Sequence, residues 1–173
     1  VKSALPYATT PKTTTSSTSS SSDEELILNP IIDLSGWQLP QDIDYDVLSN
    51  HISGAIIRVF GGSQISKDSN AASSNGVDKS FKTHIKELKK RDVPVAVYSY
   101  AQGASVKEMK EEARIFYKNA SPYKPTYYWI DVEEETMPNM EEGVQAFLAE
   151  LKRLGADKVG LYIGAYFMLE QEV

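Results

Sequence analysis

The sequence contains no cysteine, only two histidines and no apolar run long enough to cross a membrane. Missing cysteine excludes disulfides and thiolate metal sites. A bilayer span needs about 20 consecutive apolar residues, so no membrane insertion is predicted. The charge balance is acidic, with 24 Asp and Glu against 18 Lys and Arg, whereas nucleic-acid binding requires a basic surface. Neither nucleic acid nor lipid is therefore expected as a partner.

The amino-terminal region has almost nothing to bury. It contains the tract TTPKTTTSSTSSSSDEE, residues 9–25. Such a composition cannot offset the entropy cost of ordering, so residues 1–26 are predicted to form a flexible tail or linker and residues 27–173 the folded domain. The tail has no apolar segment of signal-peptide type. Ser/Thr-rich tethers are frequent on exported cell-surface proteins, which favours a secreted protein.

After the tail, apolar β-branched runs alternate with amphipathic helical patterns. Strands are predicted within residues 26–35, 52–62, 93–103, 125–133 and 158–164, and helices within residues 78–91, 105–120 and 139–155. This alternation is typical of parallel β/α units and predicts the α/β class. An open doubly wound sheet and a β/α barrel both fit. In either fold, functional residues gather at the carboxyl ends of the strands.

Several residues carry end signals for helices. Ser105 followed by Glu108 is a capping box, and Gly155 predicts a helix end. Asp78 is interpreted as the N-cap of the first predicted helix. Asp44 and Asp46 are interpreted in the same way, as caps of a helix or turn.

Polar and aromatic residues gather at the predicted strand ends. They are Asp33, Trp37, Arg58, Tyr98, Tyr100, Asp131, Glu133 and Tyr162. No Gly-rich phosphate-binding turn follows the first strand, which argues against a dinucleotide cofactor. His51 and His84 lie in or near helical segments, so they are expected to be surface or packing residues. Ser-His-Asp chemistry consequently lacks its histidine.

Asp131 and Glu133 are separated by one residue at the end of the fourth predicted strand. Side chains alternate along a strand, so both carboxyls are expected on one face, with Cα atoms about 6.6 Å apart. Two carboxyls that close repel each other, which raises one pKa and suits acid–base work at a glycosidic bond. The alternatives are a solvated acidic loop or a cation site of clustered oxygens. Glu134 and Glu135 are expected to be solvated loop charges.

Five segments together resemble a known family. IIDLSGWQ, IDYDVLSNHISGAIIRVFGG, VDKSFKTHI, VPVAVYSYAQG and YYWIDVE occur in the order and spacing of the glycoside hydrolase family 25 lysozymes, the Chalaropsis-type muramidases. The resemblance runs from about residue 31 to residue 164. It implies a modified (β/α) TIM-like barrel that cleaves the β-1,4 bond between N-acetylmuramic acid and N-acetylglucosamine in peptidoglycan. It implies no metal or other cofactor, and we expect a monomer.

The resemblance also implies residue roles. Glu133 matches the general acid, Asp131 the adjacent carboxylate that orients the substrate's N-acetyl group or a water, and Asp33 the acid that ends the first strand. The expected substrate-binding residues are Tyr98, Tyr100, Arg58, Trp37 and Tyr162.

The resemblance stops near Gly164, before about two terminal strand units and a further aspartate that the family has. The catalytic domain is therefore expected to be incomplete at its carboxyl end. Two alternatives stay open, a non-catalytic module that binds peptidoglycan and a β/α glycosidase of chitinase type. The second is the weaker, because the chain lacks the longer acidic array of that family.

Overall fold

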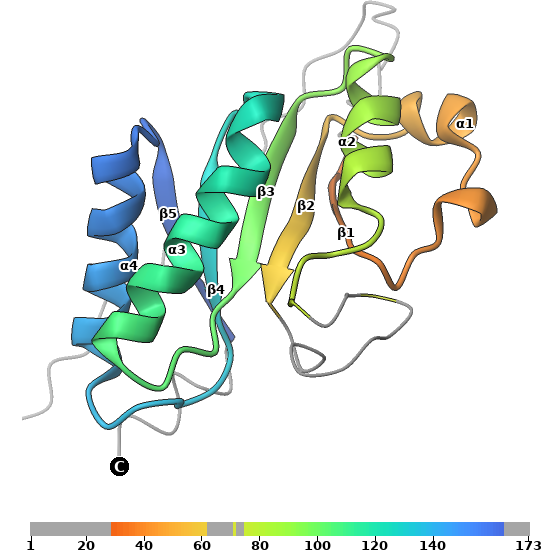
Figure 1. Ribbon diagram of the computed structural model, residues 1–173. Helices are drawn as coiled ribbons and strands as arrows, with labels where there is room; N and C mark the ends of the chain where they lie inside the picture. Colours follow the sequence, from red (N-terminus) through yellow and green to blue (C-terminus); the bar gives the residue numbers. More distant parts are fainter. Residues whose placement is uncertain (1–28, 62–70, 72–74, 165–173) are drawn as a thin grey trace, which may run out of the picture.

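The computed structural model describes residues 29–61, 71 and 75–164, and strands alternate with helices along them (Figure 1). The strands are β1 (Ile31–Leu34), β2 (Gly54–Gly61), β3 (Val95–Tyr100), β4 (Tyr128–Val132) and β5 (Val159–Ile163). The helices are α1 (Tyr45–Ser49), α2 (Phe81–Lys89), α3 (Val106–Ala120) and α4 (Met140–Leu154), with 3₁₀ turns η1 (Pro40–Asp42) and η2 (Ser121–Tyr123). The predicted tail lies outside the described residues.

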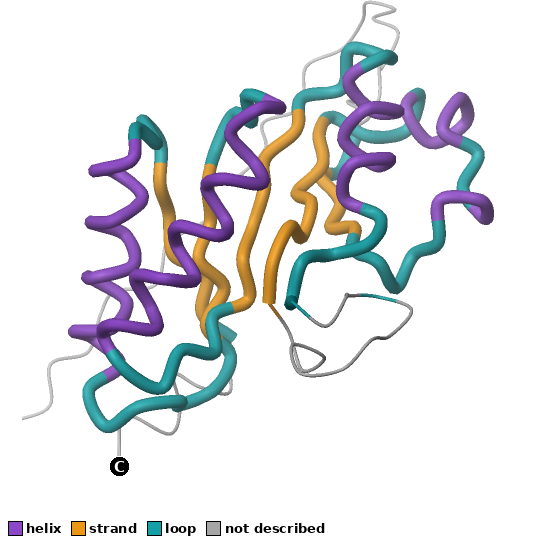
Figure 2. Tube along the Cα trace, in the orientation of Figure 1, coloured by secondary structure: helices purple, strands orange, loops and turns teal. Residues whose placement is uncertain are grey.

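The five strands form one parallel sheet in the order β1-β2-β3-β4-β5. Parallel neighbours need crossover connections, and α2, α3 and α4 make three of them over the same face of the sheet (Figures 1 and 2). The α/β class is thus confirmed. Helices on a single face are typical of a β/α barrel rather than a doubly wound sheet. Within the described residues the strands form an arc of such a barrel, with β1 and β5 as its edges.

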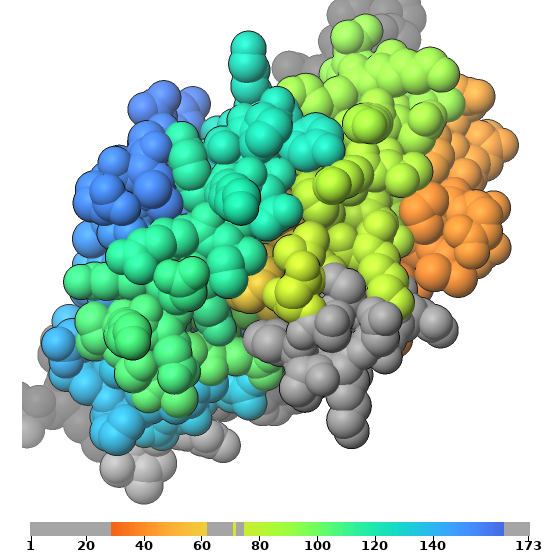
Figure 3. Space-filling view, viewed as in Figure 1, coloured from red at the N-terminus to blue at the C-terminus, as the bar shows by residue number. Residues whose placement is uncertain are grey.

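The apolar core lies between the sheet and the helices. Strand side chains alternate, so Val97 is buried under the helices while Tyr98 points to the opposite face. Phe81, Phe116 and Phe147 enter the core from α2, α3 and α4, and none is more than 1% exposed. In the space-filling view of this side, helices α2 and α3 cover the central strands (Figure 3). This packing leaves the other face of the sheet for the functional site.

The opposite face of the sheet carries exposed apolar side chains. On the edge strands, Ile31 is 65% exposed and Tyr162 is 56% exposed. A mainly apolar hollow of about 230 Å³ also lies on this face, and its walls include Ile31, Ile56 and Trp129. No described helix covers this face.

The helix ends follow the predicted signals in three cases. Ser105 Oγ accepts a hydrogen bond from the Glu108 N–H at 3.2 Å, as a capping box requires. Gly155 ends α4 with φ at 110°, a conformation that favours glycine. Asp44 caps α1 by accepting from the N–H groups of Asp46 and Val47. None of the described helices is long and apolar enough to span a bilayer.

The predicted N-cap of α2 is wrong by two residues. Ser80 occupies the N-cap position and makes no side-chain cap bond. Asp78 lies upstream of it, and Asp78 Oδ1 accepts from the N–H groups of Ser80 and Phe81 at 2.8 and 3.1 Å. Asp78 thus caps the start of α2 from two residues upstream with Oδ1, while Arg58 engages its Oδ2.

The two histidines have structural roles. His84 is 0% exposed, and burial lowers its pKa. Its Nε2 donates to the carbonyl oxygen of Ser35 at 3.1 Å, which leaves Nδ1 to accept from the Tyr45 hydroxyl at 2.6 Å. His84 therefore ties α2 to the end of β1 and to α1. His51 is exposed after α1, as a surface histidine should be.

Candidate active site

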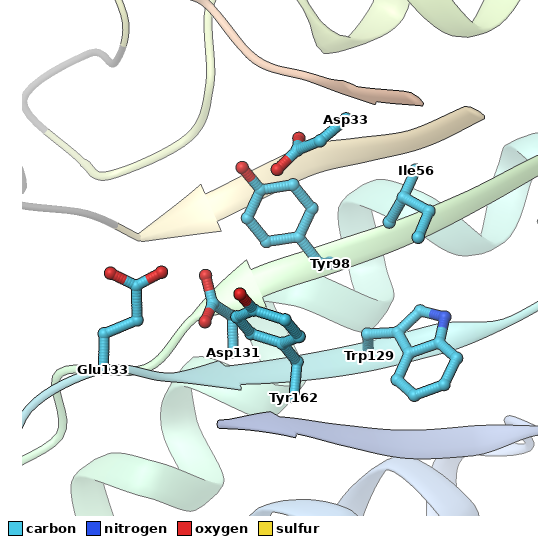
Figure 4. A pocket seen from close by; sticks show the side chains of 7 residues that line it. All are labelled: Asp33, Ile56, Tyr98, Trp129, Asp131, Glu133 and Tyr162. Atoms are coloured by element: carbon cyan, nitrogen blue, oxygen red, sulfur yellow. The ribbon is translucent and has the colours of Figure 1, made fainter. Parts of the chain in front are cut away.

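A pocket of about 330 Å³ opens at the carboxyl ends of the strands, on the face without helices. Every strand contributes to it: it is lined by Asp33 from β1, Ile56 from β2, Tyr98 from β3, Trp129 and Asp131 from β4, Glu133 just after β4, and Tyr162 from β5 (Figure 4). Strand pairing brings these side chains together. Asp33 is paired with Ile56, Tyr98 with Trp129, and Asp131 with Tyr162.

The two adjacent carboxylates project from the same side of β4 (Figure 4). β4 ends at Val132, so Glu133 is the first residue beyond it. The two residues differ in burial, because Asp131 is only 7% exposed and Glu133 is exposed. Burial and then the charges of Glu133 and Asp33 raise the pKa of Asp131 to about 7, against a smaller opposing effect of Arg58. Among the described residues, Asp131 Oδ1 has no hydrogen-bond partner.

Asp131, the buried carboxyl of the pair, therefore has a raised pKa. The sequence predicted that one pKa must rise without saying which. A buried acceptor with no partner is uncommon in native proteins and needs a specific reason. In a pocket, an incoming polar group can provide that partner.

Asp33 faces the pair from the other side of the pocket. The hydroxyl of Tyr98 points toward its carboxyl (Figure 4). Loss of hydration around the carboxyl raises the pKa of Asp33, and this contact with Tyr98 opposes the rise. Burial and the charge of Asp33 in turn raise the pKa of Tyr98. Tyr98 consequently stays a neutral hydrogen-bond donor at any ordinary pH.

Arg58 is not among the residues that line the pocket. It is 7% exposed, and its Nε and Nη2 both donate to Asp78 Oδ2 at 3.1 Å. The same oxygen accepts from the Gly36 N–H at 2.7 Å, which fixes the loop after β1. Arg58 acts on the pocket through its charge, which lowers the pKa of Asp33 and of Asp131.

Tyr100 and Trp37 also lie outside the pocket lining. The Tyr100 hydroxyl donates to Glu134 Oε1 at 3.4 Å. Trp37 is 53% exposed on the loop after β1, where its backbone N–H donates to Ser35 Oγ. Glu134 is exposed, as predicted for a loop charge, but it is hydrogen-bonded to its neighbours.

Two pocket residues were missed in the sequence, Ile56 and Trp129. Trp129 stacks on Tyr127 with ring centroids 4.9 Å apart, and Gly160 on β5 leaves room for its ring. The alternation that joins Asp131 to Glu133 also places Trp129 on their face, since it lies two residues before Asp131. Ile56 gives no comparable signal, because it stands inside a continuous apolar run.

The donor set of the pocket consists of carboxylates, tyrosine hydroxyls and aromatic rings. In the described part of the chain, no three His, Asp or Glu side chains are grouped so as to hold a metal ion. The site combines two carboxyls of raised pKa, Asp33 and Asp131, with the exposed carboxyl of Glu133, two residues after Asp131. It can therefore donate and accept protons at a bond held between aromatic walls.

Solved structures resemble the chain over most of its length. GHIP, described as a glycosyl hydrolase 25 of Streptococcus pneumoniae participating in host cell invasion, is 56% identical with a TM-score of 0.79; the match covers 84% of this chain and 63% of that one. The catalytic domain of endolysin ply40 from bacteriophage P40 of Listeria monocytogenes is 25% identical with a TM-score of 0.68, covering 82% of this chain and 66% of that one. This chain thus spans slightly less than two thirds of either protein.

The modular autolysin LytC of Streptococcus pneumoniae shares the fold, with 20% identity and a TM-score of 0.64 over 80% of this chain and 33% of that one. No curated protein sequence matches the chain. The sequence model described as glycosyl hydrolases family 25 matches residues 32–173, which include every residue of the pocket. The chain therefore belongs to glycosyl hydrolase family 25.

Proposed function

We propose that this domain hydrolyses peptidoglycan at the β-1,4 bond between N-acetylmuramic acid and N-acetylglucosamine. The observation that carries this proposal is the pocket of Asp33, Asp131 and Glu133 at the strand ends of a family 25 domain. Similarity to a phage endolysin and to an autolysin supports a cell-wall substrate. The expected partner is a glycan strand, bound by a monomer outside the cell membrane.

Glu133 is assigned the role of general acid. Its side chain is exposed to the pocket, where it can reach the glycosidic oxygen and donate a proton as the bond breaks. Asp131 is assigned the role of orienting the substrate's N-acetyl group or a water. Its unpartnered Oδ1 is an acceptor for an N–H or O–H group that the substrate brings. Asp33 adds negative charge on the opposite wall, which favours the positive charge that develops on the sugar ring.

The aromatic walls suit a sugar. The aromatic rings of Trp129 and Tyr162 line the pocket, and the apolar faces of pyranose rings pack on aromatic side chains. The Tyr98 hydroxyl can donate to a ring substituent. Trp37 and Tyr100 lie outside the pocket, so a direct contact of theirs with sugar requires a glycan that extends past its rim.

The test is digestion of purified, insoluble peptidoglycan by the wild type and by Glu133→Gln. New reducing ends are reduced with borohydride and identified by mass spectrometry, and a muramidase produces muramitol. Loss of a general acid costs on the order of 10²–10⁴ in rate, so Glu133→Gln should release reducing ends at least about 100-fold more slowly. Glu135→Gln is the matched control, because Glu135 is exposed two residues further along the same loop, and its rate should equal that of the wild type.

Three results would contradict this assignment. Equal rates for the wild type and Glu133→Gln would exclude Glu133 as the acid. Glucosaminitol in place of muramitol would move the cleavage to the other glycosidic bond. Tight binding to peptidoglycan without new reducing ends would make the domain a binding module.

A further inference from the structure

A buried carboxylate that the proposed chemistry does not use lies behind the site. Glu112 is on the second turn of α3 and is 9% exposed. Its Oε2 accepts a hydrogen bond from the backbone N–H of Gln102 at 3.1 Å, and the N–H of Gly103 also bonds to this carboxylate. One buried side chain thus satisfies two consecutive amides of the β3–α3 loop, which we define as residues 101–105.

The β3–α3 loop is packed closely on the start of α3. A Cβ atom on Gly103 would lie 2.7 Å from the backbone nitrogen of Met109, so only glycine fits. The next amide, of Ala104, donates to Glu108 Oε2 at 2.8 Å. With the Glu112 bonds, three successive N–H groups of the loop are held by carboxylates of one helix.

The same loop is bonded to the segment that carries the proposed acid. Thr136 Oγ1 donates to the carbonyl oxygen of Gly103 at 2.7 Å. Gln102 Nε2 donates to Glu134 Oε1 at 2.8 Å, and Glu134 directly follows Glu133. The segment from Glu133 to Thr136 is therefore attached at two points to the loop that Glu112 holds.

We propose that Glu112 is a positioning residue for Glu133, acting through the β3–α3 loop and its bonds to Glu134 and Thr136. This role rests on the proposed function of Glu133 as general acid. Glu133 is exposed and lies beyond the end of β4, so no strand pairing fixes it. The residues that follow it, Glu134 and Thr136, are bonded to the β3–α3 loop, and that loop is in turn bonded to the carboxylate of Glu112.

Burial raises the pKa of Glu112 to about 7, the N–H groups of Gln102 and Gly103 oppose that rise, and the nearby charge of Glu108 adds to it. Burying a carboxylate costs free energy of folding, and hydrogen bonds to the carboxylate offset that cost only in part. An apolar residue would serve the packing of α3 alone. A carboxylate at this position fits the need to hold the loop.

Two variants of Glu112 separate positioning from packing. Glu112→Met keeps the length of the side chain but removes both acceptor oxygens, whereas Glu112→Gln keeps one. Glu150→Met is the matched control. Glu150 is a carboxylate of similar burial on α4, and its hydrogen bonds within the described residues go to Arg114 and Arg153 rather than to the loop.

The first readout is peptidoglycan hydrolysis at a temperature where all variants are folded by circular dichroism. Glu112→Met should lower kcat at least about tenfold with KM within about twofold, because binding walls remain while the acid is misplaced. Glu112→Gln should recover most of kcat, and Glu150→Met should keep it. Wild-type kcat in Glu112→Met, or an equal loss in Glu150→Met, would overturn the positioning role.

The second readout does not depend on turnover. In ¹H–¹⁵N spectra, Glu112→Met should shift the amide resonances of Gln102, Gly103, Glu133 and Glu134 and speed hydrogen exchange at Gln102 and Gly103, while Glu150→Met should not. Unchanged Glu133 and Glu134 resonances in Glu112→Met would overturn the inference even if the wild type were inactive. An inactive wild type with these shifts present would instead contradict the proposed function and leave the positioning of Glu133 supported.

Discussion

Replacing Asp131 by Asn should stabilise the protein above pH 7 and leave its stability nearly unchanged near pH 4. In the unfolded chain an aspartate titrates at its ordinary pKa of 3.8, whereas burial raises the pKa of Asp131 to about 7 in the folded protein. Between these two values the folded state binds a proton that the unfolded state has lost. The free energy of unfolding therefore falls as pH rises through this window, and asparagine removes that loss.

The size of the effect follows from the two pKa values. Each tenfold difference in proton affinity corresponds to about 1.4 kcal/mol, so the change from 3.8 to about 7 gives an upper value of about 4 kcal/mol. Water entering the open pocket screens the charge and reduces this figure. We expect Asp131→Asn to gain about 2–4 kcal/mol at about pH 8, and nearly nothing at about pH 4, where both side chains are neutral.

The assay is urea denaturation of the wild type and Asp131→Asn across about pH 4 to pH 8.5. The difference between the two curves isolates Asp131, because other raised groups such as Glu112 are common to both proteins. Asp42→Asn, at an exposed position in η1, should give no pH-dependent difference. Equal or lower stability of Asp131→Asn at about pH 8 would refute the reasoning. The gain in stability should accompany a loss of hydrolysis, because the buried carboxylate of Asp131 that destabilises the fold is also proposed to act on the substrate.

Two further substitutions test the surroundings of the pocket. Asp78→Asn weakens the buried ion pair beneath the site and should lower the free energy of unfolding by about 3–5 kcal/mol in urea denaturation, while Asp46→Asn at an exposed pair should have little effect. An equal change in the free energy of unfolding for both variants would show that burial does not determine how much each ion pair contributes to stability. Gly160→Ala would place a methyl group 2.4 Å from the Trp129 ring, so the ring must move. We expect a shift of tryptophan fluorescence and a several-fold higher KM with kcat retained, whereas Gly54→Ala, with its nearest contact at 3.4 Å, should change neither.

The parallel strands could be predicted because both of their faces are covered or line the site. β2, β3 and β4 appear in the sequence as continuous apolar runs, and the helices between them are one-sided. Local rules also predicted the two acids on one face of β4, the cap at Ser105 and the end at Gly155. In each case the determining contact is within a few residues along the chain.

Contacts between distant residues could not be predicted in this way. The ion pair of Arg58 with Asp78, 20 residues away, has no local signal in the sequence. Alternation puts Asp131 and Glu133 on one face, yet their different burial depends on where β4 ends and which neighbours cover it. Glu112 has no sequence signal at all, because its role depends on how a loop folds back on α3.

The order of the strands has a consequence for folding. Each strand pairs with the strand before it in the sequence, so the sheet grows by one crossover unit at a time, although paired residues such as Ala55 and Val95 lie far apart along the chain. Parallel pairing across a crossover is a non-local contact, and such contacts slow folding relative to helical domains. The sheet can grow from β1 toward β5 as the chain leaves the ribosome. The pocket has walls from both ends of this series, so Asp33 and Tyr162 line it together only after β5 has joined β4.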